Sequence, residues 1–118
     1  MLKRTLIFSA MALMMPLGAC NSNQEASENS PETVDAFVEN GAKDLIKGKL
    51  KDPDSAVFTA VAVSRKSGHP MACGRVNSKN SFGGMTGPQR FVSNGGGLAV
   101  LEEEMADGEM DKTWERFC

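Results

Sequence analysis

The chain opens with an apolar run followed by a polar stretch. Residues 6–17 (LIFSAMALMMPL) are almost entirely apolar, and residues 21–30 (NSNQEASENS) are almost entirely polar. Two basic residues precede the apolar run and two small residues follow it, which is the order of a secretory signal. The run is shorter than the roughly 20 apolar residues that cross a bilayer. We therefore expect a signal peptide at residues 1–19 and a solvated tether at residues 20–30.

The next segment carries apolar side chains at helical spacing. They recur at intervals of three, four and seven residues: Val34, Phe37, Val38, Leu45 and Ile46. Ser30 is a capping residue, Pro31 suits the first helical position, and lysines gather toward the end of the segment. The pattern predicts an amphipathic helix from Pro31 to about Leu50, with these apolar side chains facing the core of the domain.

Beyond this helix the periodicity changes to that of strands. Between Ala56 and Arg65, β-branched residues alternate with small or aromatic ones, and turn sequences flank the segment. We expect four strands and a short second helix: residues 56–65, 71–76, 90–93 and 98–103, then 105–118. The pattern predicts an α+β domain over residues 31–118, with one N-terminal amphipathic helix packed on a small antiparallel sheet.

The end of the first apolar run resembles a known processing signal. Leu17-Gly18-Ala19-Cys20 resembles the lipobox of bacterial lipoproteins. The resemblance implies that the chain is cut before Cys20 and that Cys20 carries several acyl chains, which together hold a protein on a bilayer. Asn21, where an aspartate would favour the inner membrane, implies sorting to the outer membrane. We expect the domain to face the periplasm. An ordinary secreted protein with a cysteine near its cleavage site is the alternative.

If Cys20 carries lipid, two of the three cysteines remain available to form a disulfide. In an oxidising compartment we expect Cys73 and Cys118 to form a disulfide. Two alternatives remain open at this stage: a reactive thiol, and a metal site built from His69, Cys73 and Cys118. The sequence has no Cys-x-x-Cys pair and no second histidine, so we expect no metal and no cofactor.

Charge is distributed unevenly along the chain. Residues 43–90 hold nine bases and three acids, whereas residues 21–42 and 91–118 are acidic. Either the bases and acids neutralise one another in the fold, or a basic face meets an anionic lipid or polymer. The expected export of the protein and its negative total charge argue against nucleic acid as a partner. The sequence has no phosphate-binding glycine motif, which argues against a nucleotide ligand.

The most distinctive stretch is ACGRVNSKNSFGGMTGPQRFV, residues 72–92. Together with KDPDSAVF, residues 51–58, it resembles a family of small exported bacterial proteins of unknown function, whose segments read KDPxSAxF, CGxVNxKN and GGxxG. Met85 stands where that resemblance leads us to expect an aromatic residue. The resemblance implies no activity.

Two interpretations of the glycine-rich loop at residues 77–90 are open. In the first, the side chains of Asn77 and Asn80 satisfy turn amides while Phe82 tucks under the sheet. In the second, glycine amides and nearby cations receive an anion or an acidic partner. The candidate binding residues are Arg75, Asn77, Lys79, Asn80, Phe82, Gly83, Gly84, Met85 and Arg90.

No catalytic constellation emerges from the sequence. His69 and Cys73 would lie about 13 Å apart along a strand, the Gly-x-Ser-x-Gly motif is absent, and residues 102–104 fit an exposed acidic run better than a carboxylate pair. We expect a non-catalytic, lipid-anchored lipoprotein of the bacterial envelope whose domain binds a protein or envelope partner. The alternative is a periplasmic inhibitor or immunity protein that blocks a lysozyme-like cell-wall hydrolase with the loop at residues 77–90.

Overall fold

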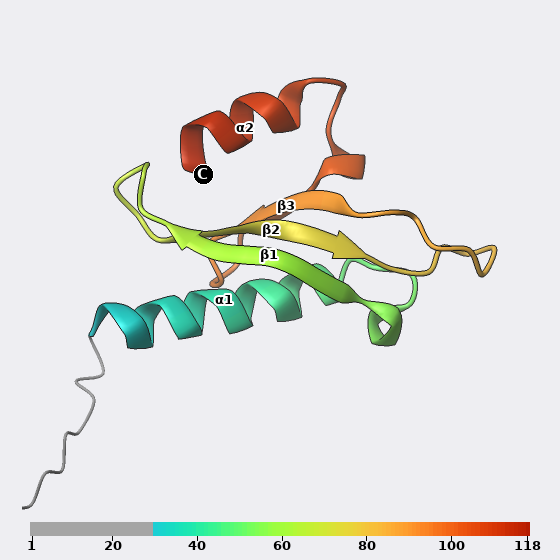
Figure 1. The fold of residues 1–118 in the computed structure, drawn as a ribbon, viewed down its shortest axis with the longest axis horizontal. Coiled ribbons are helices and arrows are strands. Elements are labelled where there is room, and N and C mark those ends of the chain that lie inside the picture. The colour runs from blue at the N-terminus through green and yellow to red at the C-terminus, as the bar shows by residue number, and fades with distance from the viewer. Residues whose placement is uncertain (1–29) are drawn as a thin grey trace, which may run out of the picture.

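The computed structural model describes residues 30–118 as a four-stranded sheet between two helices (Figure 1). Its elements, in chain order, are α1 (Pro31–Lys47), β1 (Val57–Ser64), β2 (Met71–Asn77), β3 (Gln89–Ser93), β4 (Ala99–Leu101) and α2 (Glu109–Phe117). Short 3₁₀ helices occupy Pro53–Ser55 and Glu102–Glu104. The expected signal peptide, Cys20 and nearly all of the tether lie outside the described residues.

The sheet is an antiparallel meander in the order β1-β2-β3-β4. Helix α1 covers one face, and the shorter α2 lies over the other (Figure 1). The predicted α+β class, with a helix on an antiparallel sheet, is confirmed. The four expected strands and both helices are present, although most of the ends differ by a few residues.

Helix α1 begins as the sequence predicts and ends slightly earlier. The Ser30 hydroxyl accepts the Thr33 N–H at 3.3 Å, which caps the first turn. The helix stops at Lys47, and Gly48 N–H donates to the carbonyl of Asp44 at 3.1 Å. The turn that follows, rather than further helix, carries the chain to Leu50.

Two apolar positions on α1 differ from the prediction: Phe37, and Leu45, which is only partly buried and packs against neither core cluster. The buried side chains are Val38, Ala42 and Ile46, which are spaced by four residues and face the sheet. Phe37 is 70% exposed. Successive helix positions differ by about 100° around the axis, so centring the contact on Val38 turns Phe37 toward solvent. The predicted core role of Phe37 is wrong.

Each face of the sheet has its own cluster of buried side chains. On the α1 side, Phe91 and Leu101 meet Ile46, and Phe58 packs edge-on against Phe91 with ring centroids 5.7 Å apart. On the α2 side, Met110 and the Cys73–Cys118 disulfide lie among buried residues of β2 and β3. Helix α2 therefore buries the apolar side chains on the face of the sheet that α1 does not contact.

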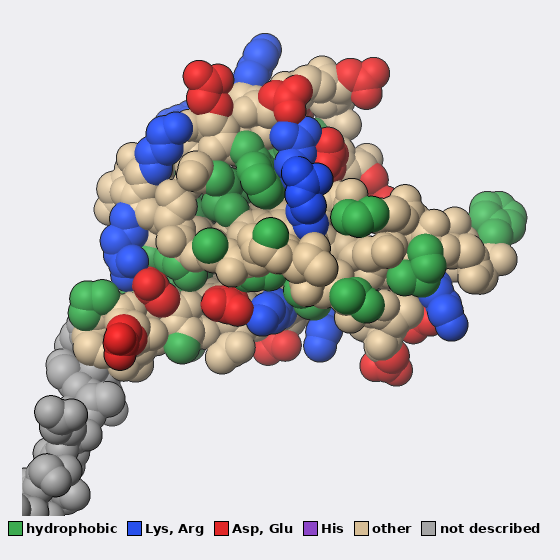
Figure 2. Space-filling view, viewed as in Figure 1, with side chains coloured by type: hydrophobic (Ala, Val, Ile, Leu, Met, Phe, Trp, Pro, Cys, Tyr) green, Lys and Arg blue, Asp and Glu red, His purple; other side chains and the backbone are tan. Residues whose placement is uncertain are grey.

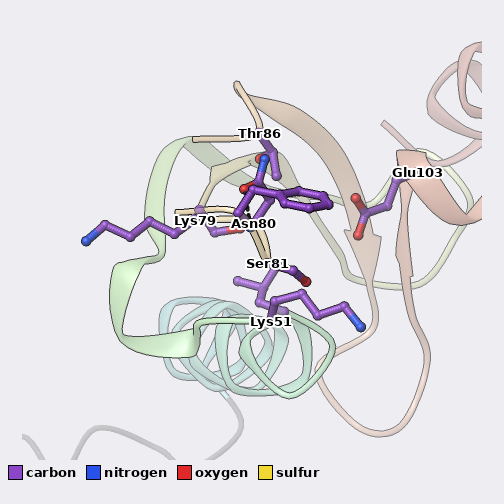
Figure 3. Close-up of a pocket in the computed structure, with 9 residues that line it drawn as sticks. Lys51, Lys79, Asn80, Ser81, Thr86 and Glu103 are labelled. Carbon is purple, nitrogen blue, oxygen red and sulfur yellow. Dashed lines mark hydrogen bonds between the residues drawn. The ribbon is translucent and has the colours of Figure 1, made fainter. Parts of the chain in front are cut away.

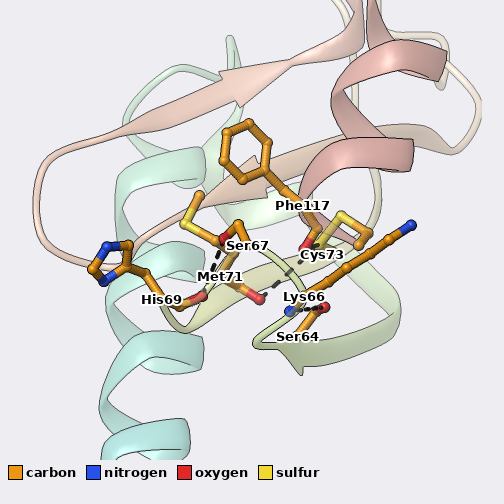
Figure 4. The surroundings of a disulfide bond; sticks show 8 residues. Ser64, Lys66, Ser67, His69, Met71, Cys73 and Phe117 are labelled. Atoms are coloured by element: carbon orange, nitrogen blue, oxygen red, sulfur yellow. Dashed lines mark hydrogen bonds between the residues drawn. A yellow bond between two sulfur atoms is a disulfide. The ribbon is translucent and has the colours of Figure 1, made fainter.

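The predicted disulfide is confirmed. Cys73 of β2 is bonded to Cys118, which directly follows α2, with their Cα atoms 6.1 Å apart (Figure 4). Because the two sulfurs are joined to each other, neither is a free thiol or a thiolate metal ligand. The reactive-thiol and metal-site alternatives are therefore wrong for these two cysteines. His69 lies in the turn between β1 and β2, and its ring points away from the bond (Figure 4).

The last predicted strand is shorter than expected. Strand β4 ends at Leu101, and Glu102–Glu104 form a 3₁₀ helix instead of extending it. Two carboxylates fix this change of direction: Glu104 accepts the Leu101 N–H at 3.0 Å, and Glu102 accepts the Arg90 N–H at 3.0 Å. The acidic run is thus a turn held by its own side chains.

Candidate functional site

The loop that joins β2 to β3, residues 78–88, is the candidate functional site. It extends from the end of the molecule opposite the start of α1 (Figure 1). Its two arms meet in a short antiparallel bridge between Lys79 and Met85. The residues between them form the tip. We call this segment the β2–β3 loop.

Asn80 holds the tip of the β2–β3 loop. Its side-chain oxygen accepts the N–H groups of Phe82 at 3.0 Å and Gly84 at 3.1 Å, while its own N–H donates to the Gly84 carbonyl at 2.8 Å. Gly83 has a φ of 80°, a conformation that favours glycine. The tip therefore has a defined backbone shape before it meets any partner.

Side chains from the strand ends fix the base of the loop. The Asn77 side-chain oxygen accepts the Gly87 N–H at 3.1 Å, and the Ser55 hydroxyl accepts the Lys79 N–H at 2.8 Å. The prediction that Asn77 and Asn80 satisfy turn amides is confirmed. Ser55 is an anchor that the sequence analysis missed, although it belongs to the KDPDSAVF segment that was singled out.

The loop presents its large apolar side chains to solvent. Phe82 is 96% exposed and Met85 is 47% exposed. Val57, which pairs with Asn77 at the base of the loop, is also exposed. Figure 2 shows apolar side chains at this end of the molecule. The alternative in which Phe82 tucks under the sheet is wrong, because the tip lies beyond the last strand pair.

Arg90 belongs to the α2 side of the fold. Its guanidinium makes two hydrogen bonds to the Glu102 carboxylate, at 3.1 and 2.7 Å, and an ion pair with Asp111 at 2.7 Å. The Cζ atoms of Arg90 and Arg75 lie 5.6 and 5.8 Å from the ring centroid of Trp114. These contacts fasten α2 to β2 and β3.

The predicted anion site is therefore not formed. Arg75 and Arg90 contact α2, and Lys79 lies on the loop. The Gly84 and Gly87 amides donate to asparagine side chains, and the Gly83 amide donates to the Asn80 carbonyl at 3.1 Å. The anion-binding interpretation fails because the backbone donors it needs are already used.

The Arg90–Glu102 contact makes stability depend on pH. Hydrogen bonds from Arg90 lower the pKa of Glu102 from 4.5 to about 2. The folded state therefore binds this proton less readily than the unfolded chain, so stability is lost as the pH falls from about 4.5 toward 2. We expect Glu102→Gln to have a shallower loss of thermal stability over this range than the unaltered protein. The effect is modest because the carboxylate is partly exposed.

Thermal unfolding midpoints measured across this pH range check the prediction. The control is Glu115→Gln, which removes an exposed carboxylate on α2 that makes no ion pair with another described residue. The control should keep the acid dependence of the unaltered protein. If the unfolding midpoints of both variants fall equally steeply with decreasing pH, Arg90 does not favour the ionised form of Glu102.

Ion pairs of the described residues account for part of the uneven charge along the chain. There are five, and each joins a base from residues 43–90 to an acid from one of the flanking segments. The pairs are Glu39–Lys43, Asp35–Arg65, Lys49–Glu104, Arg90–Glu102 and Arg90–Asp111. The interpretation that the bases and acids neutralise one another is confirmed for these residues.

A pocket of about 240 Å³ lies beside the β2–β3 loop (Figure 3). Leu50 and Lys51, which follow α1, form part of its wall, and Glu103 forms another part. The loop contributes Ser81 and Phe82, among other residues. The sequence analysis did not find this pocket, because its walls come from three separate segments.

Within residues 30–118, no three His, Cys, Asp or Glu side chains are grouped so that they could hold a metal ion. No helix in the same described range is long and apolar enough to cross a membrane. No family model, no curated protein and no solved structure matches this chain. The functional argument therefore depends on the β2–β3 loop and its surroundings.

Proposed function

We propose that the chain is a non-catalytic, lipid-anchored envelope lipoprotein whose domain binds a protein partner through the tip of the β2–β3 loop. One observation carries this proposal: Phe82 is 96% exposed on a tip whose backbone is held by Asn80. An aromatic side chain buries a large area on binding, and a preformed backbone reduces the entropy lost. Aromatic side chains are also common among the residues that dominate binding energy.

The position of the loop supports this role. The chain enters the domain at Ser30, and the loop lies at the far end of α1 (Figure 1). If lipid on Cys20 anchors the preceding segment, the domain can present Phe82 away from the bilayer. A lipoprotein on the outer membrane, facing the periplasm, could thus meet a partner in that compartment. The proposed location at the outer membrane depends on the resemblance of residues 17–20 to a lipobox.

The Phe82 side chain is the direct test of the binding site. A soluble form of residues 21–118 is used to capture partners from envelope extracts of cells that make the protein, and the affinity of the captured partner is then measured. We expect Phe82→Ser to weaken binding at least about tenfold, since a buried aromatic anchor contributes on the order of 2 kcal/mol. Stability should not change, because the ring is exposed.

Phe37→Ser is the matched control, since Phe37 is also exposed but lies on α1. It should bind the partner as the unaltered protein does. If Phe82→Ser binds with full affinity, or if Phe37→Ser loses as much, the tip is not the recognition element.

The proposed anchor is tested separately from the binding site. We expect Cys20→Ser to move the protein from the membrane fraction to the soluble fraction, because several acyl chains are needed for durable attachment. Fractionation followed by immunodetection measures this shift. A variant that stays with the membrane would contradict lipid attachment at Cys20 but would leave the loop proposal intact.

A second candidate function is inhibition of a cell-wall hydrolase. The observation that favours it is the outward direction of both Phe82 and Met85 on a protruding loop with Lys79 at its base. A glycosidase cleft holds two carboxylates, which an inserted loop with a cation could face. In a lysozyme assay, Lys79→Ala should weaken inhibition, whereas Arg75→Ala, whose side chain contacts Trp114, should not. Absence of inhibition by the unaltered protein would eliminate lysozyme as the target.

A further inference from the structure

The pocket beside the β2–β3 loop brings two opposite charges to one small cavity. Lys51 and Glu103 both line it, together with the side chains of Ser81 and Thr86. In Figure 3 the charged ends of Lys51 and Glu103 reach to the same side of the pocket from different segments. Leu50 adds an apolar surface. The cavity thus offers a cation, an anion, hydroxyl groups and an apolar wall to a single ligand.

Neither charge is neutralised within the described part of the chain. Lys51 and Glu103 take part in none of the ion pairs that join residues 30–118. Their neighbours Lys49 and Glu104 do pair, at 2.9 Å. That ion pair joins the two segments beside the pocket, whereas Lys51 and Glu103 make no ion pair with each other.

The size of the pocket limits what it can hold. At about 240 Å³ it is smaller than the roughly 300–1,000 Å³ of pockets that bury drug-sized ligands. It therefore suits one small unit rather than an extended polymer. A unit with a carboxylate and an ammonium group could satisfy Lys51 and Glu103 at once, by charge-assisted hydrogen bonds.

We propose that this pocket binds an amino-acid-type unit, free or as a dipeptide, with its carboxylate at Lys51 and its ammonium group at Glu103. Its apolar part would lie against Leu50, which lines the same cavity. Exposed ion pairs are weak, so the dissociation constant should be on the order of millimolar. The proposal does not depend on the protein partner of the loop.

Titration with dialanine tests the proposal. The probe is added up to about 20 mM to the mature chain carrying Cys20→Ser, and amide shifts are followed by NMR. We expect saturable shifts at residues 51, 81, 86 and 103. Lys51→Met and Glu103→Gln should each weaken binding about fivefold or more. Thermal unfolding verifies that both variants fold, as expected for replacements of exposed side chains.

Blocked probes identify which charge each residue recognises. N-acetyl-dialanine lacks the ammonium group, so it should bind the unaltered protein weakly. Its affinity for Glu103→Gln should be almost the same as for the unaltered protein, because the group that Glu103 recognises is already missing. Dialanine amide lacks the carboxylate and should behave likewise with Lys51→Met. The control variants are Lys47→Met on α1 and Glu115→Gln on α2, which should bind dialanine normally.

Four results would overturn the proposal. They are the absence of shifts at the pocket, blocked probes that bind as tightly as dialanine, control variants that lose as much affinity, and tighter binding of a neutral sugar such as N-acetylglucosamine. None of these results bears on whether Phe82 anchors a protein partner, so the two proposals fail independently.

Discussion

Replacing Cys118 with serine is expected to lower the free energy of unfolding by about 4 kcal/mol. The Cys73–Cys118 disulfide joins residues 45 positions apart, and a constraint of this length removes considerable freedom from the unfolded chain. Helix α2 has nine residues, of which Met110 is buried, and isolated helices of that length are marginal in water. Without the bond, α2 depends on the packing of Met110 and Trp114 and on the contacts of Arg90.

Urea unfolding followed by Trp114 fluorescence measures this loss. Trp114 reports on α2 directly, because its ring contacts the guanidinium groups of Arg75 and Arg90 and packs against the buried cluster on the α2 side of the sheet. Reducing the unaltered protein should reproduce the behaviour of Cys118→Ser. Lys112→Ser, an exposed position on the same helix, should leave the transition unchanged. A loss below about 1 kcal/mol would mean that packing alone holds α2.

Replacing Gly41 with alanine is expected to lower stability by about 2 kcal/mol or more, although alanine is the better helix former by about 1 kcal/mol. A Cβ atom at Gly41 would overlap the carbonyl oxygen of Gly95, in the turn between β3 and β4. Backbone atoms cannot rotate away as a side chain can. The substitution must therefore push α1 from the sheet and loosen the packing of Val38 and Ala42.

Gly48→Ala provides the matched comparison at the end of the same helix. Its added Cβ atom would lie 3.4 Å from the carbonyl oxygen of Leu45, which is ordinary contact, and its backbone is already helical. We expect it to be neutral or to stabilise the protein by up to about 1 kcal/mol. Urea unfolding of both variants gives the free energies. The same effect at both positions would contradict the close approach of Gly41 to Gly95.

Much of the fold was predictable because local patterns and the tertiary structure agree. The residue types of β1 alternate with a period of two, which predicted a strand, although a bulge between Thr59 and Ala62 interrupts the alternation in the sheet. The start of α1 has the expected cap and proline. Phe37 was misplaced because a stripe of apolar residues does not say where the contact is centred. The early end of β4 was missed because it depends on carboxylates that accept backbone N–H groups of Leu101 and Arg90.

The candidate site was predictable only in part. The asparagines of the β2–β3 loop could be assigned to turn amides, since short polar side chains favour such bonds. The direction of Phe82 could not be decided, because an aromatic residue in a loop suits either a core or an interface. Lys51 and Glu103 are far apart in the sequence and each looks like an ordinary surface charge. Only the Lys49–Glu104 ion pair and the fold around it bring them to one pocket.

The most direct test of the account is photo-crosslinking from position 82 in living cells. A photoreactive phenylalanine analogue replaces Phe82 in one variant and Phe37 in another, since both side chains are exposed. The account predicts one dominant crosslinked envelope protein from position 82 that is absent from position 37. No product at position 82, or the same products from both positions, would contradict the claim that the β2–β3 loop is the recognition element.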